Sequence, residues 1–167
     1  FLNHMIELFV FHGYFDLDLS VSGDTHIDIH HTNEDIGIVL GKAFKKALGE
    51  EKAGIKRFGS AFAPMEGTVG QCVIDISGRG FFKFHCATPM PAQKGTEGYE
   101  FSHFEHFMES FAHNLGATLN FTIQNHSDDL HTNLETMFKS LGLALDQATT
   151  VDPRRVGQVP STKGIID

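Results

Sequence analysis

Two short segments of the sequence combine histidine and glutamate at the spacing of one helical turn. The first contains His30, His31 and Glu34, and the second contains His131 and Glu135. Residues three or four positions apart share a helix face, so each segment would bring imidazole and carboxylate groups together. Such donors suit manganese, iron, nickel or zinc, and the lack of cysteine in both segments disfavours a structural zinc site. Because a divalent ion takes four to six ligands, we expect the two clusters to complete each other, within a chain or between subunits.

Each cluster also has an explanation that needs no metal. The first would serve as a solvated helix start, where acidic residues favour the helix dipole. In the second, Thr132 and Glu135 have the spacing of a capping box with Thr132 as the N-cap. A shift of the chain by 101 residues, however, places His30 on His131 and Glu34 on Glu135. These matching positions favour metal binding.

Four basic residues are candidates for an anion site. Arg57, Arg79, Lys139 and Lys163 stand out against a formal net charge of −8, and guanidinium and ammonium groups bind phosphate or carboxylate. The alternative for any single arginine is a surface ion pair. The acidic net charge argues against a nucleic-acid groove or an anionic membrane surface as the main partner.

The remaining composition favours a cytoplasmic location. No apolar run reaches the roughly 18 residues of a membrane span, and no signal peptide is visible. The 2 cysteines, Cys72 and Cys86, do not make a disulfide framework, so a reducing compartment is the simpler interpretation. The sequence opens at Phe1 without a methionine, and we expect further strands to precede it.

Hydrophobic periodicity predicts the elements that must position these residues. Apolar residues at helical spacing predict helices over 5–12, 32–48, 99–114 and 133–149. Alternating or short apolar runs predict strands over 16–21, around 61–62, and over 71–76, 81–84 and 118–123. Alternation also continues at 26–29, Pro89, Pro91 and Gly95 mark a loop, and residues 151–167 show no periodicity.

The shift of 101 residues aligns more than the two clusters. It also pairs Leu40 with Leu141 and Gly41 with Gly142, and in both halves a predicted helix and strand precede the cluster. We infer an α+β fold built from a duplicated half-domain, with the helices packed on one face of a sheet.

Seven motifs resemble, in order and spacing, those of imidazoleglycerol-phosphate dehydratase, a family that dehydrates imidazole glycerol phosphate in histidine biosynthesis. They are Phe1-Leu2-Asn3-His4-Met5, Phe11-His12-Gly13, His30-His31-Thr32-Asn33-Glu34-Asp35, Arg57-Phe58-Gly59, Asp75-Ile76-Ser77-Gly78-Arg79, Phe138-Lys139 and Pro160-Ser161-Thr162-Lys163-Gly164. The resemblance runs over all 167 residues and implies a metal-dependent hydro-lyase that forms imidazole acetol phosphate.

The resemblance also implies an architecture. Two repeats like domain 2 of ribosomal protein S5 would span 1–95 and 96–150, and a substrate-binding tail would span 151–167. Trimers would assemble into a 24-subunit shell, with two manganese ions per active site shared between subunits.

The resemblance assigns site residues by position. One metal ion would be bound by His4, His31 and Glu34, and the other by His30, His131 and Glu135. The residues that would carry catalysis are His30, Glu34, His131 and Glu135. The residues that would contact the phosphorylated imidazole substrate are His12, Arg57, Arg79, Lys139, Ser161 and Lys163.

The sequence departs from the family pattern at the site itself. Asn120 and Thr132 stand where the family has histidine ligands, Gly67 replaces an acidic residue and Ile29 replaces an aspartate. Loss of an imidazole from each presumed metal predicts weaker metal binding. Three hypotheses stay open: a working dehydratase with altered metal binding, an impaired paralogue that serves as a ligand-binding or structural shell, and a metal-dependent lyase or isomerase acting on another small phosphorylated substrate.

Overall fold

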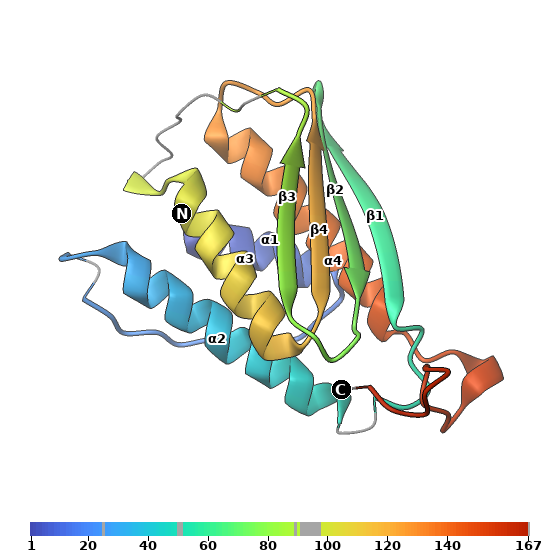
Figure 1. Ribbon diagram of the computed structural model, residues 1–167. Helices are drawn as coiled ribbons and strands as arrows, with labels where there is room; N and C mark the ends of the chain where they lie inside the picture. The colour runs from blue at the N-terminus through green and yellow to red at the C-terminus, as the bar shows by residue number, and fades with distance from the viewer. Residues whose placement is uncertain (25, 50–51, 89, 91–97, 167) are drawn as a thin grey trace.

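A four-stranded sheet forms the centre of the computed structural model, which describes residues 1–24, 26–49, 52–88, 90 and 98–166 (Figure 1). The strand order is β1-β2-β4-β3. The strands are β1 (Phe58–Met65), β2 (Thr68–Asp75), β3 (Phe81–Cys86) and β4 (Thr118–Gln124). β2 pairs antiparallel with both β1 and β4, whereas β3 runs parallel to β4. The strands predicted at these four places are confirmed.

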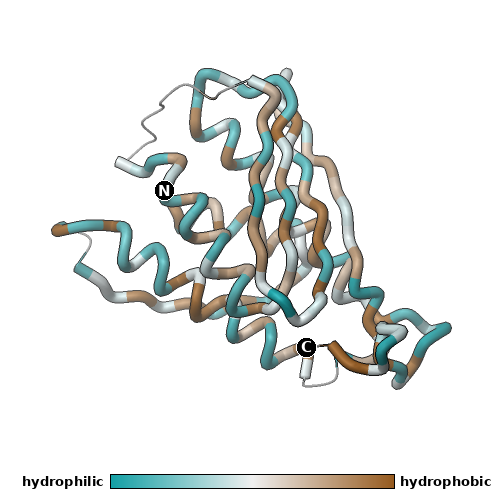
Figure 2. Tube along the Cα trace, viewed as in Figure 1, coloured by the Kyte–Doolittle hydropathy of each residue, from teal (hydrophilic) through white to brown (hydrophobic). Residues whose placement is uncertain are grey.

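One face of the sheet is buried against helices, and the opposite face is more open. In β4, Leu119, Phe121 and Ile123 are buried as predicted, and the intervening Asn120 lies on the opposite, more open face. Polar residues alternate with these hydrophobic ones along β4, and Figure 2 shows hydrophobic stretches along the strands of the sheet. Successive side chains of a strand point to opposite faces, so this alternation decides which face receives the helices.

Two helices pack directly on the sheet, and the other two pack on those helices. They are α1 (Leu2–His12), α2 (Ile29–Leu48), α3 (Phe101–Leu115) and α4 (Leu130–Thr149). α4 packs on β1 and β2, and α3 packs on β3, while α1 lies against α4 and α2 lies against α3. The predicted helices and the α+β class are therefore confirmed.

α2 and α4 behave as copies of one another. Each is 20 residues long, and each boundary of α4 lies 101 positions after that of α2. Asp28 caps α2 by accepting a hydrogen bond from His30 N, and Asp129 caps α4 by accepting one from His131 N. The same cap therefore fixes both histidine clusters at the start of a helix.

Two equivalent glycines bring these helices close to their neighbours. A Cβ atom on Gly41 would lie 2.7 Å from the Phe111 carbonyl oxygen of α3, and one on Gly142 would lie 2.4 Å from the Phe9 carbonyl oxygen of α1. In chain order, α1 and α2 form the first helix pair, and α3 and α4 form the second. The glycine contacts therefore pack α2 of the first pair on α3 of the second, and α4 of the second pair on α1 of the first.

Several sequence expectations are wrong in detail. No strand forms over 16–21, although Leu17 and Leu19 are half-buried, because an alternating segment forms a strand only where a neighbour pairs with it. Residues 26 and 27 form a turn, and α2 begins at Ile29. In α2 the residues Val39, Ala43 and Ala47 are exposed, because the glycine face makes the contact with α3.

The capping box considered as an alternative explanation for the start of α4 does not form. Asp129 is the N-cap and its carboxylate accepts hydrogen bonds from the backbone N–H groups of His131 and Thr132. Thr132 lies inside the helix, where its hydroxyl donates to Asp129 Oδ2 at 3.0 Å. A carboxylate that accepts from two backbone groups satisfies more of the free helix donors than Thr132 could.

The C-terminal tail is tied to the segment before β1. Asp152 N donates to the Gly54 carbonyl at 2.7 Å, and Ile55 forms a bridge with Val151. Strands β1 to β3 precede residue 95 and β4 follows it, yet all belong to one sheet; the division into 1–95, 96–150 and 151–167 stays a prediction. The loop expected at Pro89, Pro91 and Gly95 lies outside the described residues.

Within the described ranges, no helix combines the length and the apolar character needed to cross a membrane. Cys72 and Cys86 are both free thiols. They lie on β2 and β3, which β4 separates.

Candidate metal centre

Three side chains that could bind a metal converge where α1 and α4 begin. His4 Nε2 lies 3.1 Å from Glu135 Oε1, and His131 Nε2 lies 2.8 Å from the same oxygen. The ligand atoms of all three residues lie within 4.8 Å of one another, the one such group of three or more in the part of the chain that the structure describes. Two imidazoles and one carboxylate are a donor set that divalent transition metals accept, so these residues fit a metal ion.

The local sequence explains this convergence. The Asp129 cap fixes the first turn of α4, and His131, Glu135 and Lys139 then follow at intervals of four residues along one helix face. Lys139 Nζ lies 2.5 Å from Glu135 Oε2. The carboxylate of Glu135 is therefore held through both of its oxygens.

The surroundings of Glu135 keep it ionised. Its side chain is only 10% exposed, and this burial acts to raise its pKa. Hydrogen bonds from Lys139, His4 and His131 outweigh burial and lower the pKa of Glu135 to about 2. The group is thus an anion at any physiological pH, as a metal ligand requires.

The first histidine cluster does not join this group. His30 Nδ1 lies 3.0 Å from His106 Nδ1, and His30 Nε2 lies 4.0 Å from Glu34 Oε2. His31 is exposed, and its ring meets that of His30 edge to face. Within one chain, His4 therefore lies with His131 and Glu135, and the division of the ligands between two ions shared by subunits stays a prediction.

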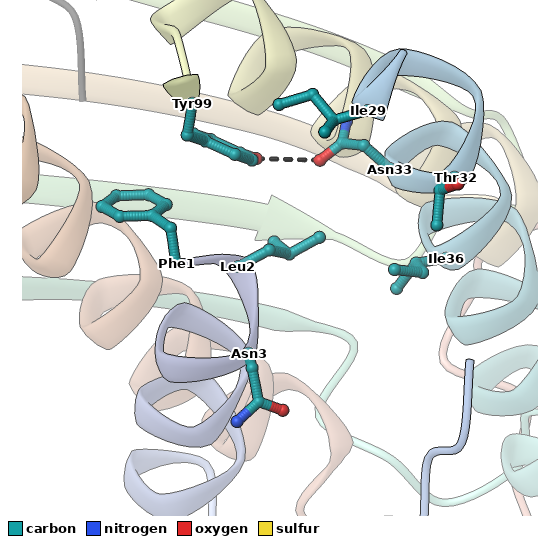
Figure 3. A pocket seen from close by; sticks show the side chains of 8 residues that line it. All are labelled: Phe1, Leu2, Asn3, Ile29, Thr32, Asn33, Ile36 and Tyr99. Carbon is teal, nitrogen blue, oxygen red and sulfur yellow. Dashed lines mark hydrogen bonds between the residues drawn. The ribbon is translucent and has the colours of Figure 1, made fainter. Parts of the chain in front are cut away.

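A pocket of about 400 Å³ lies between the start of α1, which carries His4, and the start of α2, which carries the first cluster (Figure 3). Tyr99 donates a hydrogen bond of 2.9 Å to Asn33 Oδ1 in its wall, and both residues are buried. Phe1 packs its ring on both Tyr99 and His131. Mostly apolar side chains therefore line the pocket that lies between the clusters.

Arg57, one of the predicted substrate contacts, lies at the other end of α4. Arg57 N donates to the Ala148 carbonyl near the C-terminus of α4, 13 residues after Glu135. At 1.5 Å per residue this separation is about 20 Å. One chain therefore does not bring its own Arg57 to its own His4, His131 and Glu135.

Arg57 is engaged by its own chain. Its guanidinium donates two hydrogen bonds to the Asp75 carboxylate, at 2.6 and 3.0 Å, and one of 3.1 Å to the Pro160 carbonyl. This contact places the tail residues Ser161 and Lys163 next to the start of β1. Ser161 Oγ accepts from Lys163 N at 3.2 Å.

The other predicted residues have separate positions. Arg79 is exposed in the turn after β2. His12 ends α1, eight residues after His4, and so lies about 12 Å along that helix. Asn120 lies on the more open face of the sheet, away from the helices, so it does not reach the metal group of its own chain.

Sequence reasoning missed three residues beside the clusters. His106 contacts His30, and the buried Asn33 and Tyr99 form the wall between the clusters. The spacing of His103 and His106 on α3 was a signal for the first of these, but nothing in the sequence pairs Asn33 with Tyr99, 66 residues apart.

The α+β fold and the His/Glu group that could hold a metal ion fit a metal-dependent enzyme. A profile of the imidazoleglycerol-phosphate dehydratase family matches residues 1–145. Enzymes of that name from Geobacillus kaustophilus (strain HTA426) and Bacillus subtilis (strain 168) are 49% and 47% identical over 167 residues, which span 99% of this chain and 82% of each relative.

Solved structures agree with the sequence relatives. The crystal structure of imidazoleglycerol-phosphate dehydratase from Staphylococcus aureus has a TM-score of 0.79 and 30% identity, covering 90% of this chain and 83% of that one. The Pyrococcus furiosus enzyme, crystallised in complex with (S)-C348, has a TM-score of 0.77 and 31% identity, covering 98% and 85%. The chain therefore belongs to the imidazoleglycerol-phosphate dehydratase family.

Membership of this family establishes the class of reaction. The chain is a carbon–oxygen hydro-lyase of a metal-dependent family, which dehydrates a phosphorylated imidazole substrate in histidine biosynthesis. The dehydratase hypothesis is thus confirmed, and nothing in the comparisons favours an impaired paralogue.

Proposed function

We propose that dehydration of imidazole glycerol phosphate takes place at a composite site between copies of this chain. His4, His131 and Glu135 of one copy would hold one side of the metal centre, and His30, His31 and Glu34 of another copy would hold the other side. The observation that supports this proposal is that, within one chain, the group of His4, His131 and Glu135 does not include His30, His31 or Glu34, and that the pocket lined by Phe1 and Tyr99 lies between the two clusters.

The basic residues support the same arrangement. Arg57 contacts the end of α4, about 20 Å from Glu135, so a small substrate held by the metal group of one chain would not reach the Arg57 of that chain. We assign the phosphate contacts to residues of a neighbouring copy: Arg57, Ser161 and Lys163 near the C-terminal end of α4, and Arg79 in the turn after β2. Arg57 orients the tail through Pro160, and Lys163 and Arg79, both exposed, supply the charge.

The residues divide the chemistry as follows. Bound divalent cations, which we propose are two manganese ions per site, supply Lewis acidity that stabilises negative charge on the imidazole ring. His30, Glu34, His131 and Glu135 hold and orient the reacting end, and Lys139 holds the carboxylate of Glu135. His12 and the basic cluster fix the phosphate end, which restricts the substrate to one orientation.

Self-assembly follows from a composite site. We propose closed trimers combined into a 24-subunit shell, since a site that needs surfaces from several copies is complete only in a closed assembly. The free cysteines suit a reducing compartment, so a cytoplasmic location belongs to the same proposal.

The decisive experiment is complementation between two inactive variants. Glu135→Gln disables the α4 cluster, and Glu34→Gln disables the α2 cluster. If the sites are composite, co-assembly of both variants in equal amounts restores about one quarter of the wild-type activity, since each site draws its two chains at random. If each chain holds a complete site, the mixture remains as inactive as either variant, and the composite proposal fails. Reassembled wild-type protein is the control for recovery.

A further inference from the structure

We propose that Asp75 is a positioning residue for the phosphate end of the substrate. Its carboxylate fixes the guanidinium of Arg57, and Arg57 in turn fixes the C-terminal tail that carries Ser161 and Lys163. This inference deepens the proposed function and rests on it, because Arg57, Ser161 and Lys163 are among the residues that we assign to the phosphate. Asp75 acts through them and does not itself touch the substrate.

The contact between Asp75 and Arg57 is a bidentate ion pair. Arg57 Nε donates to Asp75 Oδ1 at 2.6 Å, and Nη2 donates to Oδ2 at 3.0 Å. A planar guanidinium that binds both oxygens of a carboxylate is fixed in orientation as well as in position. The side chains of Arg57 and Asp75 are 17% and 27% exposed, so solvent ions screen the pair only in part. Asp75 therefore determines how the guanidinium of Arg57 is turned.

The backbone of Arg57 is held on both sides. Its N–H donates to the Ala148 carbonyl at 2.8 Å, and its carbonyl accepts from Ile76 N at 3.1 Å. Its φ of 72° lies in the left-handed region, where few residues other than glycine are found. Such a conformation persists only where the surrounding structure imposes it, and it is most common at functional sites. The fold therefore specifies the direction in which this side chain leaves the backbone.

The guanidinium nitrogen that does not bind Asp75 binds the tail instead. Arg57 Nη1 donates to the carbonyl of Pro160 at 3.1 Å, and Pro160 is itself buried. The tail turns directly after this contact, where Ser161 Oγ accepts from Lys163 N at 3.2 Å. One arginine side chain thus joins the end of β2, where Asp75 lies, to the turn that presents Lys163.

A second bidentate pair in the same part of the chain has a local role. Arg154 donates to both carboxylate oxygens of Asp152, at 2.9 and 2.7 Å. These two residues lie within one short turn of the chain, and the Arg154 side chain is 83% exposed. Arg57 and Asp75 are 18 positions apart. Of the two pairs, theirs is the one that connects separate elements to the assigned phosphate contacts.

The test is steady-state kinetics with imidazole glycerol phosphate on the assembled protein supplied with Mn²⁺. Asp75→Asn keeps the size of the side chain but removes a charge-assisted hydrogen bond, so we expect KM to rise about tenfold. The phosphate lies away from the bonds that break, so kcat should change less than about twofold. Asp75→Glu retains the carboxylate and should recover most of the loss. Arg154→Gln, which breaks the other bidentate pair, is the matched control and should leave KM unchanged.

Lys163→Ala separates a failure of this inference from a failure of the proposed function. If Lys163→Ala raises KM and Asp75→Asn does not, the tail binds the phosphate without help from Asp75, and the inference alone is overturned. If neither variant raises KM, the assigned phosphate contacts fail together with the inference. A lower kcat with unchanged KM in Asp75→Asn would also overturn the inference, because the affected step would then be the chemistry.

Limited digestion with trypsin reports on the tail independently of activity. We expect the bond after Lys163 to be cleaved several-fold faster in Asp75→Asn than in wild type, because the turn loses its attachment to β2. Arg57→Lys, which keeps the charge but lacks the second donor to the carboxylate, should show the same increase. Cleavage after Arg155, whose N–H donates to the Asp152 carbonyl at 2.9 Å, is the internal reference. Equal rates after Lys163 in all three proteins would overturn the inference.

Discussion

Replacement of Glu135 by glutamine should remove a large, acid-sensitive part of the stability of the metal-free protein. The pKa of Glu135 lies at about 2 in the folded chain, well below its ordinary value of 4.5, and its side chain is 10% exposed. Since each pKa unit corresponds to about 1.4 kcal/mol, ionisation of this group contributes about 3 kcal/mol at neutral pH. Because the folded pKa is depressed, this contribution is complete above pH 4.5 and is lost as the pH falls toward 2.

The assay is urea unfolding in the presence of chelator, at matched protein concentration, for wild type and Glu135→Gln at pH 7, 4 and 3. We expect the variant to be less stable by about 3 kcal/mol at pH 7, and the difference to shrink steadily at the two lower values. Glu34→Gln is the matched control, because its carboxylate is 46% exposed and lies 4.0 Å from His30. A difference that stays constant from pH 7 to pH 3 would refute the electrostatic explanation.

Two further predictions concern packing and pH. Gly142→Ala places a methyl group 2.4 Å from a backbone carbonyl of α1 and should cost about 2 kcal/mol in chemical denaturation. Gly67→Ala, which meets nothing within 4 Å, should be near neutral; equal effects would contradict the close helix approach. Burial is the main cause that lowers the pKa of His103, whose Nδ1 accepts from Glu100 N at 2.8 Å. As the pH falls below 6.5, His103 therefore takes up a proton more readily in the unfolded chain than in the folded one, which destabilises the fold. The melting temperature of wild type should fall further between about pH 7.5 and 5.5 than that of His103→Asn. Equal decreases would show that His103 does not cause this pH dependence.

The predictable part of the fold is the part fixed by local pattern. The apolar residues that recur at helical spacing over 133–149 predict helix α4, since the apolar side of a helix packs on the core whatever its neighbours are. The segment 16–21 shows the limit of the same reasoning. Alternation correctly predicts that Leu17 and Leu19 face inward, but a strand also needs a pairing partner, which the segment itself does not encode.

The site shows a similar division. The helical spacing of His131 and Glu135 was sufficient to predict their contact, whereas His4 lies 131 positions from Glu135 and entered only through a family resemblance. Asp75, which engages Arg57, and His106, which contacts His30, depend on tertiary packing. Local sequence predicts which side chains share a helix face, and the packing of distant elements decides which faces meet.

The glycine contacts of α2 and α4 have a consequence for how the chain holds together. Each helix pair packs the glycine-containing face of one helix against the other pair. Gly41 of α2 contacts α3, and Gly142 of α4 contacts α1. Neither pair can bury its own glycine-containing face alone. The two pairs therefore resemble the two subunits of a domain-swapped dimer that have been joined into one chain. Folding should therefore be cooperative over the whole chain, and separation of the two pairs into individual polypeptides would create two chains that each require the other to fold.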